Sequence, residues 1–298
     1  MKVLVTGIEG QVARSIAEVA SRHLGFEVAL VGRPDLDLAH KDSILPAIAR
    51  HHPDIVVNAA AYTAVDKAED EQSVAHAVNA VGAGLVAEAA AGLGVPVIHL
   101  STDYVFSGEA DRPYLEDDAP APQNVYGRTK LAGEVAVAAA SPRHVILRTS
   151  WVYSPFGRNF VRTMLGLARD RESVSVVSDQ WGNPTSALDI AEAVLHVAAT
   201  VGSAAAPPKH FGTFHFAGSG STNWSGFAAE IFQISGNLGG PSAKVVEIDS
   251  ASFPVKATRP KSSCLDTARF VKVFGWQPPP WQGSLELVAQ RLLCGTEE

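Results

Sequence analysis

The chain has 298 residues, of which 46% are apolar and 18% charged, and its formal net charge is −7. This composition is typical of a globular protein with one large domain or two modest ones. The negative charge argues against a protein that coats nucleic acid, and no apolar run approaches the roughly 18 residues of a membrane helix. The two cysteines form no close-spaced pair, and residues 1–6 run directly into a predicted strand. We therefore expect no disulfides, no signal peptide and a cytoplasmic location.

A predicted strand over residues 2–6 opens the chain. The next residues read Gly7-Ile8-Glu9-Gly10-Gln11-Val12-Ala13, and apolar residues at helical spacing follow. A strand, a glycine turn and a helix are the setting of a dinucleotide-binding loop, because glycines let the backbone approach a pyrophosphate at the helix N-terminus. The spacing is Gly-x-x-Gly-x-x-Ala, so Ala13 takes the helix-packing position. A plain strand-to-helix turn is the alternative interpretation.

The second predicted strand, residues 27–31, ends at Gly32-Arg33. An NAD-selective site often has an acidic residue here for the ribose 2′-hydroxyl, whereas an arginine pairs with a 2′-phosphate. Arg33 therefore favours NADPH, although NADH use stays open and a solvent-facing arginine is the alternative. Asp37 is placed to face the adenine amino group.

The third predicted strand, residues 54–58, leads into Ala59-Ala60-Ala61-Tyr62, where small side chains let a flat cofactor lie against the backbone. A helix over residues 73–92 contains Asn79, which we expect to hydrogen-bond backbone near the next strand; a capping or exposed asparagine is the alternative. The predicted cofactor-binding residues are Gly7, Gly10, Gln11, Val12, Arg33, Asp37, Leu38, Ala59, Ala60, Ala61, Tyr62, Asn79, Tyr126 and Lys130.

The predicted catalytic residues are Thr102, Tyr126 and Lys130. A strand over residues 95–100 delivers Thr102 at its carboxyl end, where ligands bind in open α/β sheets. Tyr126 and Lys130 are four residues apart at the head of a predicted helix, so they share one helix face. A nearby ammonium lowers the pKa of a phenol, which can then give a proton to a carbonyl oxygen that the Thr102 hydroxyl holds. The alternative is a half-buried tyrosine beside a solvated lysine.

Strands and helices alternate up to about residue 149, which predicts an α/β fold with a doubly wound, mostly parallel Rossmann sheet. Residues 1–149 are expected to form this dinucleotide-binding domain, with returns near 186–218. Residues 150–298 are expected to form mainly a smaller, discontinuous substrate-binding lobe, interleaved with the first. Its predicted elements include a helix over residues 159–169, a helix over residues 224–235 and a strand over residues 244–248.

Several segments together resemble an extended short-chain dehydrogenase/reductase and, within that group, the dTDP-4-dehydrorhamnose reductase family. They are Thr6-Gly7-x-x-Gly10-Gln11-Val12, Asn58-Ala59-Ala60-Ala61-Tyr62-Thr63-Ala64-Val65-Asp66, Ser101-Thr102-Asp103-Tyr104-Val105-Phe106, Tyr126-Gly127-Arg128-Thr129-Lys130-Leu131-Ala132-Gly133-Glu134, Arg148-Thr149-Ser150-Trp151-Val152-Tyr153 and Arg259-Pro260. They span nearly the whole chain. The sequence departs from the family pattern at Ala13, the third loop position, and at Ser262, where asparagine is usual.

The resemblance implies NAD(P)H-dependent reduction of the 4-keto group of dTDP-6-deoxy-L-lyxo-4-hexulose to dTDP-L-rhamnose. It implies that Tyr126 is the proton donor and that Lys130 lowers its pKa and holds the nicotinamide ribose. It also implies substrate contacts from Asp103, Tyr104 and Trp151 at the sugar and from Arg259 at a phosphate. A core tryptophan is the alternative for Trp151.

The resemblance further implies a homodimer and, in some members, a bound Mg²⁺. The sequence has no dedicated acidic cluster for that ion, so we predict no metal-ligating residues, no nucleic-acid partner and no membrane partner. Two other functions stay open: a non-catalytic regulatory subunit of the methionine adenosyltransferase type, and another nucleotide-sugar ketoreductase or epimerase. The intact Thr102, Tyr126 and Lys130 set argues against the non-catalytic subunit.

Overall fold

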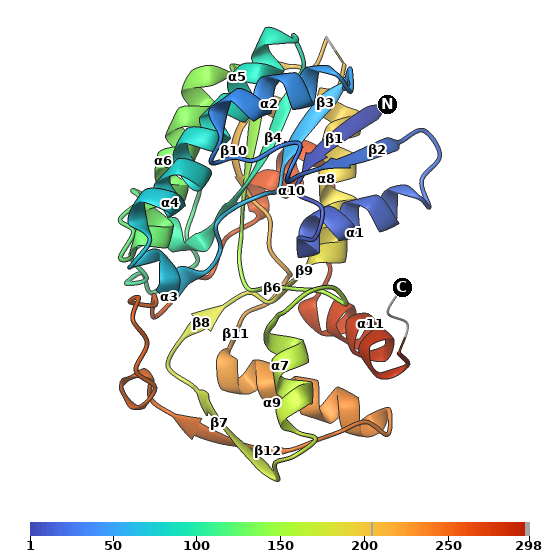
Figure 1. Cartoon of the computed structure of the whole chain (residues 1–298). Coiled ribbons are helices and arrows are strands. Elements are labelled where there is room, and N and C mark those ends of the chain that lie inside the picture. The colour runs from blue at the N-terminus through green and yellow to red at the C-terminus, as the bar shows by residue number, and fades with distance from the viewer. Residues whose placement is uncertain (204, 296–298) are drawn as a thin grey trace.

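A computed structural model describes residues 1–203 and 205–295. Its centre is a six-stranded, fully parallel sheet with the order β10-β5-β4-β3-β1-β2 (Figure 1). The strands are β1 (Lys2–Thr6), β2 (Glu27–Val31), β3 (Ile55–Asn58), β4 (Val97–Thr102), β5 (His144–Thr149) and β10 (Gly212–His215). Strand order reverses at β1, with β2 on one side and β3 on the other. The carboxyl ends of β1 and β3 therefore mark the switch point where ligands bind in open α/β sheets.

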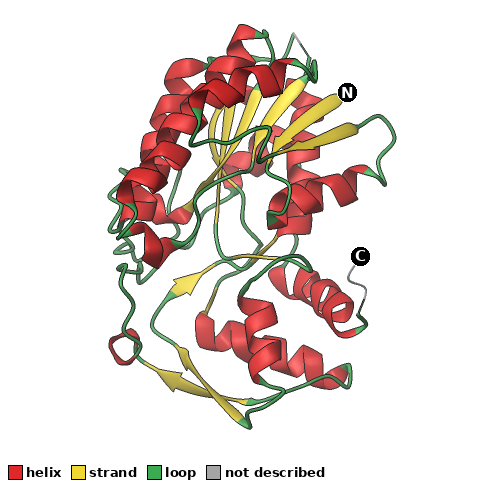
Figure 2. Ribbon diagram, viewed as in Figure 1, coloured by secondary structure: helices red, strands yellow, loops and turns green. Residues whose placement is uncertain are grey.

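Helices cover both faces of this sheet, so its strands are buried on two sides (Figure 2). Side chains alternate between the faces: Val3 and Val5 pack into one core cluster, and Leu4 packs into the other. The first cluster includes side chains from α1 (Gln11–Ala20), α8 (Ala187–Val201) and α10 (Ala268–Phe274). The second includes side chains from α2 (Lys41–Ala49), α5 (Ala83–Gly92) and α6 (Val125–Ala140).

One helical stretch corrects the expectation that no apolar run reaches membrane length. Residues Gln72–Gly92 form α4 (Gln72–His76), the π-helical turn η1 (Ala77–Gly82) and α5, with a mean hydropathy of 1.3 over an 18-residue window. Within the described residues, this is the single helix that is long and apolar enough to cross a membrane, judged by length and composition alone. Of that window, 56% is buried inside the molecule, and α5 contacts α2 and α6. These are the surroundings of a core helix.

A smaller lobe lies below the sheet in Figure 1 and has a core of its own. Its helices are α7 (Phe160–Leu167), α9 (Trp224–Asn237) and α11 (Trp281–Leu293), beside the parallel pair β7 (Ser173–Val177) and β12 (Lys244–Ile248). Short strand pairs connect it to the sheet: β6 (Val152–Tyr153) with β9 (Thr185–Ser186), and β8 (Trp181–Gly182) with β11 (Thr222–Asn223). Phe227 and Tyr153 are fully buried at its centre.

The predicted fold class, a doubly wound parallel α/β sheet, is confirmed. The segment near 186–218, which we expected to return to the dinucleotide-binding domain, contains α8 and β10. Helix α8 packs on the main sheet, and β10 is one of its strands. The tail after Arg259, which we assigned to the smaller lobe, divides between the two parts. Helix α10 places Phe270 and Phe274 in the core of the sheet, whereas α11 packs in the smaller lobe.

Candidate active site

Thr102 is the last residue of β4, a strand whose six residues are all buried. Its hydroxyl donates to Oδ1 of Asp103 at 2.9 Å and accepts from the backbone N–H of Tyr104 at 3.2 Å. It lies close enough to the phenol of Tyr126 to lower the pKa of that group. The strand end thus presents a fixed hydroxyl to the phenol, as the sequence predicts.

Tyr126 is the second residue of α6, and its position follows from the cap of that helix. The Asn124 side chain accepts from the N–H of Gly127 at 2.8 Å, which stabilises the first turn. A Cβ on Gly127 would lie 2.1 Å from the Tyr104 carbonyl oxygen, so glycine permits the close approach of α6 to the turn after β4. The Tyr104 and Tyr126 rings meet edge to face with centroids 5.8 Å apart.

Burial raises the pKa of Tyr126 to about 12, although the neighbouring Thr102 hydroxyl opposes the rise. The expected lowering of this pKa by Lys130 stays a prediction. The ammonium of Lys130 is buried and donates to the Leu100 carbonyl at 2.6 Å, so it is directed at the strand backbone. Burial lowers the pKa of Lys130 to about 8, against the charge of Glu134. Desolvation is therefore the main cause of the pKa shifts of both Tyr126 and Lys130.

A buried polar chain connects Lys130 to the first strand. Lys130 Nζ lies 3.5 Å from Nε2 of His99, and His99 Nδ1 lies 3.0 Å from the Asn58 amide nitrogen. Asn58 Oδ1 accepts from the Thr6 hydroxyl at 2.7 Å, and that hydroxyl accepts from the N–H of Ala60 at 3.1 Å. Our sequence reasoning missed this chain. The available signal was the presence of Thr6, Asn58 and His99 in three predicted strands of one sheet.

The glycine loop has the backbone that a pyrophosphate site needs. Gly7 has φ +96°, a conformation that favours glycine, and a Cβ there would lie 3.6 Å from Cβ of Ala60. Gly10 precedes α1, and a Cβ there would meet nothing within 4 Å, which leaves room in front of the helix N-terminus. Ala13 is buried at the third loop position. Gln11 Oε1 accepts from the side chains of Ser154 and Asn159 at 2.9 and 3.0 Å, linking the loop to the smaller lobe.

The residues predicted for the adenine end lie beyond β2. Arg33 is exposed. Asp37 accepts from the N–H of Ala39 at 2.9 Å and lies 3.0 Å from His40 Nδ1. The hydrogen bond from the Ala39 N–H contributes most to lowering the pKa of the Asp37 carboxyl, and the contact with His40 lowers it further. Leu38 is buried, and its carbonyl oxygen would lie 2.4 Å from a Cβ on Gly82, so it packs against η1.

Asn79 hydrogen-bonds backbone, as expected, and its predicted cofactor contact stays a prediction. It is 1% exposed. Its amide nitrogen donates to the Tyr62 carbonyl and to the Thr129 hydroxyl, each at 3.1 Å, and its oxygen accepts from the Tyr62 N–H at 2.8 Å. Both amide hydrogens are thereby used, so Asn79 ties the segment Ala59-Ala60-Ala61-Tyr62 to α6.

The predicted sugar-binding residues lie at the same edge. Burial raises the pKa of the Asp103 carboxyl to about 6, against hydrogen bonds from Ser263 and Thr102, and its Oδ2 is buried without a hydrogen-bond partner in the described part of the chain. Trp151 is half-buried with φ +46°, and its indole stacks on that of Trp224 with centroids 3.5 Å apart. Trp151 thus belongs to an aromatic pair in the smaller lobe.

Arg259, which we predicted to contact a substrate phosphate, is paired with a carboxylate. Its Nη2 donates to Oδ2 of Asp66 at 2.7 Å, and its guanidinium lies 6.0 Å from the centroid of the Tyr104 ring. Tyr104 in turn touches Tyr126, so one aromatic ring separates the two predicted ends of the substrate site.

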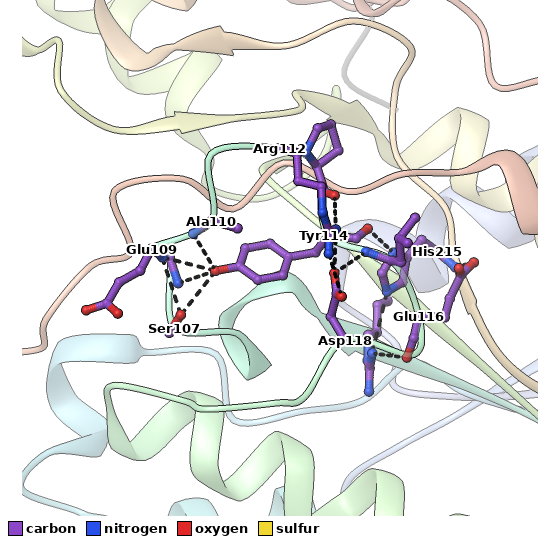
Figure 3. Close-up of polar contacts among 12 residues, drawn as sticks. Ser107, Glu109, Ala110, Arg112, Tyr114, Glu116, Asp118 and His215 are labelled. Carbon is purple, nitrogen blue, oxygen red and sulfur yellow. Dashed lines mark hydrogen bonds and ion pairs between the residues drawn. The ribbon is translucent and has the colours of Figure 1, made fainter.

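The loop after β4 is held by a residue that our sequence reasoning missed, Tyr114 (Figure 3). Its hydroxyl oxygen accepts from the backbone N–H groups of Gly108, Glu109 and Ala110 at 2.9, 3.0 and 3.2 Å. Its own N–H donates to the Cys264 carbonyl at 2.8 Å. The loop is thereby fixed against the segment that follows Arg259. Across the described residues, no group of three or more His, Cys, Asp or Glu side chains is placed to hold a metal ion.

Comparison with known proteins adds a family to this geometry. The model of the RmlD substrate binding domain matches residues 1–294. The chain is 47% identical over 293 residues to a dTDP-4-dehydrorhamnose reductase of Sinorhizobium fredii, with 98% of each chain covered. It is 40% identical to a protein of that name from Escherichia coli K12, with 99% of each covered.

Solved structures agree. A dTDP-4-dehydrorhamnose reductase from Clostridium acetobutylicum superposes with a TM-score of 0.90 at 37% identity, covering 98% of this chain and 99% of that one. A dTDP-4-dehydrorhamnose reductase from Bacillus anthracis, solved in complex with NADP, superposes with a TM-score of 0.87 at 33% identity. The match covers 96% of this chain and 98% of that one. A UDP-glucose 4-epimerase from Thermus thermophilus gives 0.78 at 20% identity, covering 99% and 100%, and shares the fold.

Proposed function

Because the chain belongs to the dTDP-4-dehydrorhamnose reductase family, we propose that it uses NADPH to reduce the 4-keto group of dTDP-6-deoxy-L-lyxo-4-hexulose, giving dTDP-L-rhamnose. The observation that carries the proposal is that Thr102 ends β4 and that Tyr126 meets Tyr104, two residues further on, at the carboxyl edge of the sheet. This arrangement supports a proton donor beside a hydroxyl that holds the ketone oxygen. A homodimer and a role for Mg²⁺ remain predictions from the resemblance, and a cytoplasmic location remains a prediction from the cysteine content and the predicted first strand.

The residues present fit a dinucleotide. Gly7 and Gly10 leave the backbone accessible at the N-terminus of α1, which lies at the switch point of the sheet. The exposed Arg33 after β2 suits a 2′-phosphate, and the NADP complex of the Bacillus anthracis relative supports that choice. When bound, NADPH supplies the hydride for the ketone carbon.

Tyr126 supplies the proton in the proposed reaction. Its raised pKa keeps the phenol protonated at neutral pH, so the donor is loaded before the substrate arrives. An alkoxide is a stronger base than a phenolate, so proton transfer to the developing alkoxide remains downhill. The Thr102 hydroxyl neighbours the phenol and would orient the ketone oxygen by turning its proton from Asp103 to that oxygen. Lys130, held at Leu100, places a positive charge beneath this site that stabilises the phenolate left after transfer.

The sugar and its diphosphate would lie between the sheet edge and the smaller lobe. The unpartnered Oδ2 of Asp103 suits a sugar hydroxyl, since a buried carboxylate oxygen without a donor is costly. The half-buried indole of Trp151 suits the apolar face of a deoxysugar. Arg259 would contact the diphosphate, for which its forked donors are matched.

The test is NADPH oxidation with a panel of 4-keto sugar nucleotides that differ in base and sugar. We expect turnover with dTDP-6-deoxy-L-lyxo-4-hexulose and formation of dTDP-L-rhamnose, identified by mass and NMR. No NADPH oxidation with any member would contradict the reaction and favour a binding role. Turnover with a different sugar only would contradict the proposed substrate.

A further inference from the structure

A short helix outside the catalytic set joins the two ends of the proposed substrate site. Helix α3 (Val65–Ala68) follows the segment predicted to lie under the cofactor. Its Ala68 is fully buried and packs with Val125, the first residue of α6. Packing therefore fixes α3 against the start of the helix that carries Tyr126. Two carboxylates, Asp66 and Glu69, extend from α3 and its C-terminal end in different directions.

Asp66 holds the segment of residues 257–259. Its Oδ1 accepts from the N–H of Ala257 at 3.0 Å, and its Oδ2 accepts from Nη2 of Arg259 at 2.7 Å. The carbonyl of Thr258 accepts from the Asn124 side chain at 2.8 Å. Three consecutive residues are thus tied to the sheet domain, and Asn124 is also the cap of α6. The Asp66 carboxylate orients the Arg259 guanidinium, and the hydrogen bond from the Ala257 N–H fixes the direction of that carboxylate.

Glu69 holds the catalytic helix. Its Oε1 accepts from the N–H of Val125 at 2.8 Å. This N–H has no partner within the helix, because the first N–H groups of a helix lack intrahelical acceptors. Asn124 satisfies the N–H of Gly127. The two acceptors fix the turn on which Tyr126 stands, one residue after the Glu69 contact.

The Asp66–Arg259 pair is a poor candidate for a stabilising element. The Asp66 side chain is 46% exposed and that of Arg259 18%, and ion pairs with such exposure contribute little to folding. A guanidinium has five N–H donors, and the described contacts with Ala257 and Asp66 use two of them. The remaining donors are available to a phosphate. The pair is therefore better suited to aim a binding group than to stabilise the fold.

We propose that Asp66 and Glu69 are positioning residues for the two ends of the substrate: Asp66 aims Arg259 at the diphosphate, and Glu69 fixes Tyr126 at the ketone. Tyr104 lies between these ends, with Arg259 6.0 Å from its ring and Tyr126 edge-on to it. One rigid helical turn thereby sets the separation of the two contacts. This inference rests on the proposed function, and it divides that function into two separable effects.

For Asp66, the test is steady-state kinetics and dTDP binding by calorimetry. We expect Asp66→Ala and Asp66→Asn to raise KM for the sugar nucleotide about tenfold or more, the loss expected for one charge-assisted hydrogen bond. The dissociation constant for dTDP should rise in parallel, with kcat little changed. In an Arg259→Ala background the Asp66 substitution should add nothing. Unchanged or tighter dTDP binding in both variants would overturn the role, because a carboxylate that merely competes with the diphosphate would tighten binding when neutralised.

For Glu69, the expected effect lies in kcat. Glu69→Ala removes the acceptor for the Val125 N–H, so we expect kcat to fall about tenfold through loss of Tyr126 alignment, with KM and dTDP binding near wild type. Glu69→Gln keeps an acceptor oxygen and should restore most of the rate. A fall in kcat that Gln does not rescue, or an unchanged kcat in the alanine variant, would overturn this role.

Asp70→Ala is the matched control. Asp70 follows Glu69 and pairs with Lys256, so it joins the same two segments without touching Arg259 or α6. We expect its kinetic constants and dTDP binding to be unchanged; an Asp66-like effect would show that any tie between these segments suffices, which would overturn the specific role of Asp66. A wild type that oxidises no NADPH would refute the proposed reaction, whereas dTDP binding would still decide whether Asp66 acts through Arg259.

Discussion

The ammonium of Lys130 donates to the carbonyl of Leu100 at 2.6 Å, inside the sheet edge that carries the proposed chemistry. A charge held in this way is expensive, and burial lowers the pKa of Lys130 to about 8. The group therefore costs stability, as is common for active-site residues, and this fits its proposed role.

That cost predicts a pH dependence. The folded pKa of Lys130, about 8, lies below the ordinary value of 10.5. Below pH 8 both folded and unfolded states carry the charge, and the folded state bears the full cost of burying it. Between pH 8 and 10.5 the unfolded state binds more protons, so this cost declines as pH rises. Lys130→Met removes it, and the variant should be more stable than wild type at pH 7.

The measurement is chemical denaturation of both proteins from pH 7 to 10.5. We expect the stability advantage of Lys130→Met to shrink by up to about 3 kcal/mol over this range. The exposed Lys244→Met is the control and should show no such trend. An advantage that stays constant with pH would contradict a depressed Lys130 pKa.

Arg33 provides a prediction about cofactor choice. It is exposed after β2, where a 2′-phosphate is expected. Arg33→Ala should weaken NADPH binding by about tenfold to a hundredfold, the value of a charge-assisted contact, and leave NADH binding unchanged. Fluorescence titration of both cofactors measures the ratio. Arg22→Ala, on the end of α1, is the control. An unchanged ratio would remove Arg33 from 2′-phosphate recognition.

Gly182 provides a prediction about the sugar side. A Cβ there would lie 2.4 Å from the Trp151 indole, so Gly182→Ala must displace that ring from its stack on Trp224. We expect KM for the sugar nucleotide to rise several-fold while the NADPH dissociation constant stays the same. Kinetics and tryptophan fluorescence report the two effects. Gly166→Ala is the control, since a Cβ there meets nothing within 4 Å. Normal kinetics in Gly182→Ala would exclude Trp151 from the sugar site.

Local spacing predicted much of this molecule. Residues 2–6 and 27–31 are strands as expected, and Tyr126 and Lys130 share a helix. Such features follow from periodicity within a few residues. The chain from Lys130 through His99 and Asn58 to Thr6 was not predictable in this way. Bonded neighbours within it are separated by up to 52 residues in the sequence, and their contacts depend on the register of neighbouring strands.

The direction in which a side chain points was the second feature that could not be predicted from the sequence. Spacing put Lys130 on the same face as Tyr126, but burial decided that its ammonium would meet the Leu100 carbonyl. Asn79 makes the backbone hydrogen bond that was expected, but spacing did not identify Tyr62, which follows β3, as its partner. The strand β7 and the backbone contact of Tyr114 with Cys264 were missed because each needs a partner far along the chain.

The central claim is that Tyr126 gives the proton to the ketone oxygen, and Tyr126→Phe tests it most directly. Phenylalanine keeps the ring that meets Tyr104 and removes only the hydroxyl that neighbours Thr102. Steady-state NADPH oxidation with dTDP-6-deoxy-L-lyxo-4-hexulose should show kcat reduced by about a hundredfold to ten-thousandfold, the usual contribution of a positioned acid. NADPH binding, measured on the same preparation, should stay near wild type. Turnover at the wild-type rate in that variant, with binding intact, would contradict the mechanism.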